Sequence, residues 1–284
     1  MQETLYKKAF KNRFFLNNLR LTIGLILLIS ICCFAVFGPF FSSFDYFQTN
    51  LDLKNSFPNK IFIFGSDELG RDIFVRVCQG IRISLFVGIS AAILDVIIGS
   101  IWGAFSALMG GIIDNVMMRT CDIISTIPYL LWVILLSVVL GSNLTTIIIT
   151  LSLTHWINMA RIIRAKILVI KELPYVHAAK LIGATRKRII FFHLLPNTIG
   201  TIVTTMTISI PVAIFTEAFL SFLGLGIQAP VASLGTMIND AIPALRYFSF
   251  RLFFPSFFLF LLMLSFNLIG DNISDLLDPK ITNE

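Results

Sequence analysis

Residues 176–197 read VHAAKLIGATRKRIIFFHLLPN, a basic and amphipathic stretch that lies between two long apolar runs. The rest of the chain has the composition of a protein surrounded by lipid. A membrane anchor does not need such a segment, whereas a membrane protein driven by a soluble partner does. The segment therefore predicts a docking surface on one side of a bilayer.

The composition of the whole chain supports this interpretation. Of 284 residues, 56% are hydrophobic and only 13% are charged, 28 are Phe, and the mean hydropathy is +0.87. A soluble domain of this size must present a mostly polar exterior to water, so it cannot hide this much apolar surface. The net charge of +6 comes from basic clusters beside the apolar runs. Such clusters set membrane orientation, and we expect no nucleic-acid partner.

A helix needs about 20 apolar residues to cross the hydrocarbon core. The first apolar run is free of charge and too long for the core of a signal peptide, so we expect it to remain as a spanning helix. The short break at residues 141–143 predicts a tight helical hairpin between the third and fourth runs. Six spans are expected: residues 21–41, 83–108, 123–140, 144–163, 194–215 and 252–270.

The distribution of Lys and Arg predicts the orientation. One basic cluster precedes the first span, and a second lies between spans four and five. With six spans both clusters, and both termini, fall on one side, which the positive-inside rule makes cytoplasmic. Residues 42–80 then lie outside. Residues 218–250, also outside, contain too many glycines and prolines for a regular spanning helix and are expected to form a re-entrant or interfacial scoop.

The basic segment itself predicts two short helices. Residues 175–182 are expected to form the first, Gly183 to break it, and Thr185 to cap the second. The small side chains of Ala178 and Ala179 allow another protein to approach the backbone closely. A basic loop that only sets topology is the alternative, and the Ala-Ala-x-x-x-Gly spacing argues against it.

These residues resemble a known family. The spacing of Ala178-Ala179, Gly183 and Leu195-Pro196 is similar to that of the cytoplasmic EAA loop of bacterial ATP-binding-cassette (ABC) importer permeases. Three further stretches resemble the dipeptide, oligopeptide and nickel permeases, and the position of the first of them is typical of the C-type, or second, permease. They are FGSDELGRD at 64–72, EAFLSFLGLG at 217–226, and Gly270-Asp271 with DLLDP at 275–279.

The resemblance implies an all-α integral membrane fold, the six-helix type I importer permease, with a coupling helix between spans four and five. It divides the chain into residues 1–80 (N-terminus, first helix and outer loop) and residues 81–284 (permease domain, with a coupling loop at 166–195). It implies a multi-pass protein of the bacterial inner membrane. The residues it assigns to ATPase coupling are His177, Ala178, Ala179, Gly183, Ala184, Arg186, Leu195 and Pro196.

The same resemblance implies a set of partners. These are a second homologous permease, two ABC ATPase subunits that bind ATP and Mg, and an extracytoplasmic substrate-binding protein. One residue departs from the family pattern, because His177 occupies the position of the usual Glu. An imidazole replaces a carboxylate only as a neutral or weakly cationic hydrogen-bond partner. With no second ligand nearby, His177 is not expected to bind a metal.

Charged residues near or within the spans are the other candidates. Asp95 is expected to face the bundle interior, where either a pathway or gating role or a structural pairing explains it. Glu217, at the outer end of span five, is expected to pair with an outer Arg or to line the translocation entrance. Asp67, Arg71 and Asp72 are interpreted either as a self-contained ion-pair cluster or as the contact for a binding protein.

Other functions are less well supported. The phosphate-binding motif G-x-x-x-x-G-K-[ST] is absent from the sequence, and so is any nucleophile-plus-base arrangement, so we expect no enzymatic activity and no bound cofactor or metal in this chain. We expect a permease subunit of an ATP-driven peptide importer. The alternatives are a permease for nickel or another small substrate, an ion-gradient-driven secondary transporter, and a scaffold without transport activity.

Overall fold

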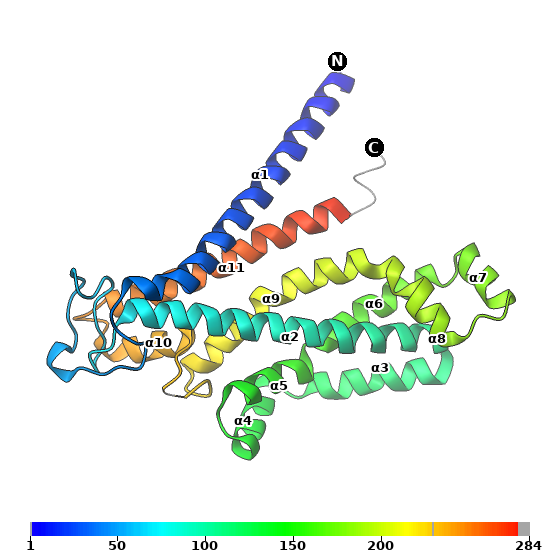
Figure 1. Ribbon diagram of the computed structural model, residues 1–284. Coiled ribbons are helices and arrows are strands. Elements are labelled where there is room, and N and C mark those ends of the chain that lie inside the picture. Colours follow the sequence, from blue (N-terminus) through cyan, green and yellow to red (C-terminus); the bar gives the residue numbers. More distant parts are fainter. Residues whose placement is uncertain (1, 229, 278–284) are drawn as a thin grey trace.

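The computed structural model describes residues 2–228 and 230–277, with side chains for residues 19–228 and 230–275. The regular elements of this part are helices, and the backbone pairing of Ser66 with Asp72 is an isolated bridge. This confirms the expected all-α fold. Figure 1 shows an elongated molecule, with the loop that follows α1 and the helix α10 at one end and the short helices α7 and α8 at the other.

Helix α2 (Ile73–Met109) is the central element of the fold. It begins at Asp72, whose side chain accepts a hydrogen bond of 2.9 Å from the backbone N–H of Phe74. Its length brings it into contact with α6 (Trp156–Ile170), α9 (Ile199–Phe222) and α1 (Gln2–Phe37). Eight of its first ten residues are buried, and the second span begins at residue 73, so the prediction of residue 83 was wrong.

Close packing of α2 on α6 depends on two glycines. A Cβ atom at Gly99 would lie 2.6 Å from the carbonyl oxygen of Trp156, and one at Gly103 would overlap the carbonyl oxygen of Ala160. Gly88 likewise faces Ile214 of α9. These three glycines therefore permit close approach of the helices.

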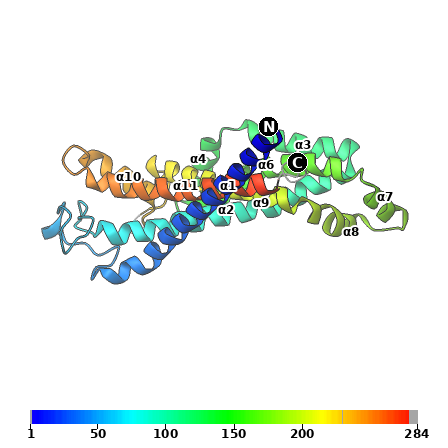
Figure 2. The same ribbon diagram turned by 90° about the horizontal axis from the view of Figure 1, so that it is seen from above.

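Helices α1 and α11 (Phe250–Leu277) pack side by side on one flank of α2 (Figures 1 and 2). Arg82 of α2 fixes the end of α1, because its Nε donates to the carbonyl oxygen of Ala35 at 2.7 Å and its Nη2 to that of Val36 at 3.2 Å. A cation at the carboxyl end of a helix also interacts favourably with the helix dipole. Part of the polar segment expected outside the membrane therefore anchors the first span.

The third predicted span is a bent pair of helices. Helices α3 (Gly111–Thr126) and α4 (Tyr129–Leu140) meet at an angle of 80°. Residues 123–140, expected as the third span, are divided by this bend, because Pro128 ends the first helix and sets the start of the second. Five helices are long and apolar enough to cross a membrane, or up to six if the bent pair forms one span.

The hairpin between α4 and α5 (Leu144–Thr154) is confirmed. Gly141 follows α4 with φ of +80°, a backbone conformation that favours glycine. Asn143 caps α5, since its Oδ1 accepts a hydrogen bond of 2.9 Å from the N–H of Thr146. Helices α5 and α6 together form one run from Leu144 to Ile170, seven residues longer than predicted.

The domain boundary predicted at residue 80 falls inside α2, so the expected N-terminal unit shares its last helix with the permease unit. Residues 278 and 279 of the C-terminal motif, and the side chains of the basic cluster at residues 7–13, lie outside the described residues. The remaining elements are η1 (Gly38–Phe41), η2 (Leu51–Leu53), α7 (Pro174–Leu181), α8 (Arg186–Arg188), the π-helix η3 (Ile189–Leu194), η4 (Pro196–Thr198), α10 (Leu234–Ala241) and η5 (Ile242–Ala244).

Candidate functional site

Residues 174–198, which we call the elbow, fold as helix, break and helix, as the sequence predicts. Helix α7 ends at Leu181, and Gly183 follows with φ of +82°. This left-handed conformation is favourable for glycine and costly for other residues. Thr185 then caps the second helix, with its Oγ1 accepting a 3.3 Å hydrogen bond from the N–H of Arg188.

The two faces of α7 have different environments. Val176 and Ala179 are buried against the elbow's own second helix, and Ala179 is only 5% exposed. Ala178 is on the exposed face. Of the two small residues expected to admit a partner, only Ala178 is therefore available. Ala179 instead allows α7 to pack closely on this chain.

The tip of the elbow carries large apolar side chains. Leu181 is 88% exposed and Ile182 is 85% exposed, and Phe191 and Phe192 on the second helix are exposed as well. Exposed apolar residues gathered on one surface are typical of a contact with another protein or with lipid. The sequence interpretation missed these four residues because it concentrated on the small side chains.

The elbow enters α9 through an irregular turn. The N–H of Leu195 bonds to the carbonyl oxygen of Ile190 at 2.9 Å, the wide spacing of a π-helix. Pro196 then begins the single turn η4. π-bulges occur frequently at functional sites. The chain therefore passes from the wide turn to a tight one at Pro196 before α9 begins.

Polar contacts attach the elbow, and Lys171 just before it, to the end of α2. Lys171 donates from Nζ to the carbonyl oxygen of Ala107 at 3.0 Å, and the guanidinium of Arg186 lies 3.2 Å from the sulfur of Met109. Apolar side chains of α2, α6 and the elbow form one continuous core beneath them. The elbow and the end of α2 are therefore in direct contact.

His177, the residue that departs from the family pattern, lies on the surface of α7. Its Nε2 is 3.5 Å from a carboxylate oxygen of Glu172, and both side chains are at least half exposed. An exposed pair of this kind contributes about 0–1 kcal/mol. His177 is therefore free to exchange this partner for another protein.

Ion pairs join α3 to α6 near the same end of the molecule. Arg164 makes a bidentate contact with Asp114, at 2.6 Å from Nε and 2.5 Å from Nη2, and Asp114 also accepts from Ser106. Arg161 lies 2.9 Å from Asp122. Bidentate pairs of this kind fix geometry as well as adding energy.

Asp95 lies inside the helix bundle, as predicted. Its side chain is 1% exposed, and its Oδ1 has no hydrogen-bond partner among the described residues. No ion pair to Asp95 is found in the same part of the chain. Structural pairing, one of the two expected explanations, therefore has no support within this chain.

Glu217 is fully buried, not at the surface as expected. Ser84 of α2 donates to one carboxyl oxygen at 3.0 Å, and Ser221 of α9 donates to the other at 2.8 Å. The expected pairing with an outer arginine is replaced by these two serines. The carboxyl group ties the outer end of α9 to α2.

Replacing Glu217 by alanine is expected to lower stability by about 2–4 kcal/mol, because two buried hydroxyls lose their partner. Glu217→Gln keeps an acceptor oxygen and should cost less than half as much. The comparison is the thermal unfolding midpoint of the purified protein in detergent, followed by tryptophan fluorescence. Equal midpoints for wild type and Glu217→Ala would contradict this role.

The outer signature forms a buried ion-pair cluster. Asp67 accepts from Nε of Arg71 at 2.6 Å and from two backbone N–H groups. Asp72 receives a 2.7 Å hydrogen bond from Ser42, while burial raises the pKa of its carboxyl. All three predicted residues are less than a tenth exposed. The geometry favours the self-contained cluster over a binding-protein contact surface.

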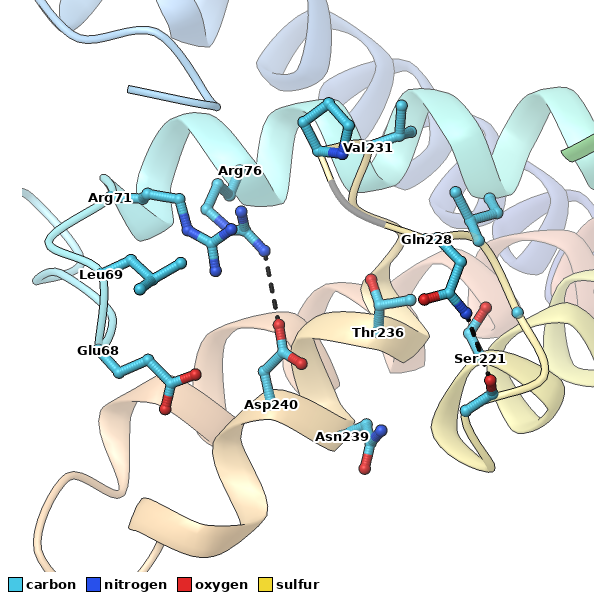
Figure 3. Close-up of a pocket in the computed structure, with 14 residues that line it drawn as sticks. Glu68, Leu69, Arg71, Arg76, Ser221, Gln228, Val231, Thr236, Asn239 and Asp240 are labelled. Carbon is cyan, nitrogen blue, oxygen red and sulfur yellow. Dashed lines mark hydrogen bonds and ion pairs between the residues drawn. The ribbon is translucent and has the colours of Figure 1, made fainter. Parts of the chain in front are cut away.

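A cavity of about 280 Å³ opens beside this cluster. Figure 3 shows the side chains of Arg71 and Arg76 turned toward Asp240, which comes from α10 in the scoop. Arg76 and Asp240 were missed by the sequence interpretation, because their contact joins segments more than 160 residues apart. Between α9 and α11 the described residues form the short helices α10 and η5 and no spanning helix, as expected for the scoop.

Comparison with known proteins identifies the family. Residues 96–283 match the family described as "Binding-protein-dependent transport system inner membrane component", and residues 5–58 match the "N-terminal TM domain of oligopeptide transport permease C". The oligopeptide transport permease OppC of Bacillus subtilis is 51% identical over 98% of this chain and 90% of its own length. The dipeptide permease DppC of the same organism is 50% identical over 91% and 81%, and OppC of Escherichia coli is 37% identical over 94% and 89%.

Solved structures show the same fold. The MetNI methionine ABC transporter, in an inward-facing conformation, matches 71% of this chain and 96% of the compared chain, with a TM-score of 0.58 and 19% sequence identity. At that identity the match supports the fold alone. Together with the matched family models, it leads to one conclusion: the chain belongs to the inner-membrane components of binding-protein-dependent transport systems, in the OppC and DppC permease group.

Proposed function

We propose that this chain is the permease subunit of an ATP-driven importer that moves peptides across the bacterial inner membrane by alternating access. The observation that carries the proposal is the exposed apolar elbow attached to the end of α2, in a chain half identical to oligopeptide and dipeptide permeases. The partners are a second homologous permease, two ATPase subunits that carry ATP and Mg, and an extracytoplasmic binding protein.

The elbow is the surface that seats in the ATPase. Leu181 and Ile182 supply apolar area, worth roughly 1.5–3 kcal/mol for each side chain fully buried. Ala178 and Gly183 allow close backbone approach beside them, and Arg186 adds positive charge. Ala179, Ala184, Leu195 and Pro196 act from within, by holding α7 against the second helix and fixing its junction with α9.

Motion of the elbow reaches the membrane through α2. The bonds from Lys171 to Ala107 and from Arg186 to Met109 make the elbow and the end of α2 move together. Because α2 also packs along α6 and α9, a push on the elbow shifts three spanning helices. This is the change that alternates access between the two sides.

The elbow and both termini lie on the cytoplasmic side in this scheme, and residues 42–72 and the scoop lie outside. The basic residues of the elbow support this orientation. Figures 1 and 2 are consistent with it, because the elbow and the loop after α1 lie at opposite ends of the molecule.

Asp95 and Glu217 have different roles in the proposal. An unpaired buried carboxylate costs several kcal/mol, so a conformation that offers Asp95 a partner is favoured over the present one. We assign Asp95 to gating for this reason. Glu217 holds the outer end of the pathway by linking α9 to α2.

Uptake into proteoliposomes tests the function. The complete transporter, reconstituted with its binding protein, is expected to accumulate a labelled tripeptide when ATP and Mg are present on the ATPase side. ADP should give no accumulation. Accumulation driven by an ion gradient without ATP would contradict the proposal in favour of a secondary transporter. Uptake of Ni²⁺ but of no peptide would favour the nickel alternative, and absence of all uptake would favour a scaffold.

A further inference from the structure

The cavity at the outer end of α2 lies where three separate segments meet. Its walls come from the outer loop and the start of α2, from the segment that follows α9, and from α10 (Figure 3). The polar side chains that line it include Glu68, Arg71, Arg76, Asn239 and Asp240. A cavity with charges of both signs on opposite walls is suited to a polar ligand.

Arg76 is the unusual member of this lining. Its side chain is only 3% exposed. Nε lies 3.6 Å from Asp67 and Nη2 lies 3.7 Å from Asp240, both longer than an ordinary hydrogen bond. Nη1 is buried and has no hydrogen-bond partner among the described residues. A buried guanidinium with an unused donor is costly, and a ligand acceptor at Nη1 removes that cost.

The neighbouring guanidinium extends the donor surface. Arg71 is held by Asp67 through Nε at 2.6 Å, which fixes its position beside Arg76. Figure 3 shows the two guanidinium groups side by side, with their ends turned toward the same space. Two forked donors at this spacing match a planar acceptor with two oxygens.

The opposite wall limits the charge of the ligand. Asp240 of α10 faces Arg76, and Glu68 of the outer loop also lines the cavity. These carboxylates repel a multiply charged anion such as phosphate more strongly than a singly charged one. A single carboxylate satisfies the arginines with the least repulsion.

We propose that this cavity binds the carboxylate group of a small organic acid, with the Arg76 guanidinium as the principal donor and Arg71 as the second. Asp240 competes with the ligand, because both lie against the Arg76 guanidinium. The proposal concerns a ligand site on the outer face and does not depend on which substrate the transporter moves.

Direct binding to the purified transporter, prepared in nanodiscs without its binding protein, tests this inference. The probe is radiolabelled N-acetyl-alanyl-alanine, and its C-terminal amide is the matched control ligand without a carboxylate. Equilibrium dialysis should show saturable binding of the acid and no saturable binding of the amide. Arg76→Gln is expected to weaken binding of the acid about tenfold or more, equivalent to about 1.4 kcal/mol.

Asp240→Asn gives the more discriminating result. It removes the competing charge while leaving Arg76 in place, so binding of the acid should become several-fold tighter. A purely structural role for the Arg76–Asp240 pair predicts weaker binding in both variants. Arg119→Gln, on the exposed face of α3, is the control variant and should bind as the wild type does.

Three results would overturn the proposal. The first is absence of saturable binding of the acid to the wild type. This includes the case in which the outer face binds a protein partner but does not bind the acid. The second is equal binding of acid and amide. The third is weaker binding in Asp240→Asn. If Arg76→Gln does not fold, the Asp240→Asn result still decides the question.

Discussion

The double substitution of Leu181 and Ile182 by aspartate is expected to abolish ATP-driven transport and to release the ATPase subunits from the membrane complex. Both side chains are more than four-fifths exposed and make no contribution to the core of this chain. In the proposed complex they are buried, so the substitution removes apolar contact and places two unpaired carboxylates in the interface. The loss in the affinity of the ATPase should exceed a hundredfold.

Co-purification of the ATPase and stimulation of its activity by peptide-loaded binding protein measure this effect. The amount of the variant chain in the membrane should equal that of wild type, since the elbow tip is not needed for folding. The matched control is Leu51→Asp with Ile61→Asp, two exposed apolar residues in the outer loop. Normal stimulation in the elbow variant would contradict the coupling role.

Substitution at Gly103 is expected to have the second largest effect. A methyl group there overlaps the carbonyl oxygen of Ala160, which belongs to the backbone of α6 and cannot turn away. Helices α2 and α6 must separate, and overpacking alone typically costs 1–3 kcal/mol. We expect Gly103→Ala to lower the unfolding midpoint by several degrees and Gly103→Leu to prevent accumulation of folded protein.

Gly270→Ala is the matched control for this experiment. A Cβ atom at Gly270 lies 3.4 Å from the nearest side-chain atom, an ordinary contact, so the same substitution should be tolerated. Size-exclusion chromatography of detergent extracts after graded heating compares the two variants. Equal stability of Gly103→Ala and Gly270→Ala would show that the α2–α6 contact is looser than the structure indicates.

Local sequence patterns predicted the elbow well. The helix ending before Gly183, the cap at Thr185 and the turn at Pro196 depend on backbone preferences of single residues, which act over a few positions. The hairpin at residues 141–143 also depends on backbone preferences of single residues. The α2–α6 and α2–α9 contacts were partly predictable, because glycines within an apolar span indicate close helix packing.

Features that depend on distant contacts were not predictable. The bend at Pro128 requires neighbours that accept the 80° angle, since proline can either kink a helix or end it. The early start of α2 depends on burial of Arg76 against α10, which no local pattern records. The burial of Glu217 was not predicted because one of its partners, Ser84 of α2, lies 133 residues away in the sequence, although Ser221 is only one helical turn away.

The exposed face of α7 could be predicted only in part from the sequence. The helix was predicted, but which of Ala178 and Ala179 faces outward depends on how α7 rotates onto the second helix of the elbow. Burial of Val176 beside Ile189 fixes that rotation and leaves Leu181 and Ile182 outside. Helix phase is therefore the part of this site that needed the structure.

Site-specific cross-linking from the tip of the elbow tests the central claim most directly. Ile182→Cys, in a chain whose four native cysteines are replaced by alanine, is allowed to react with a short bifunctional maleimide in intact membranes. The account predicts a cross-link to the ATP-hydrolysing subunit whose yield changes when ATP is added, and no labelling by a membrane-impermeant maleimide applied outside the cell. Labelling from outside, without any cross-link to an ATPase, would contradict it.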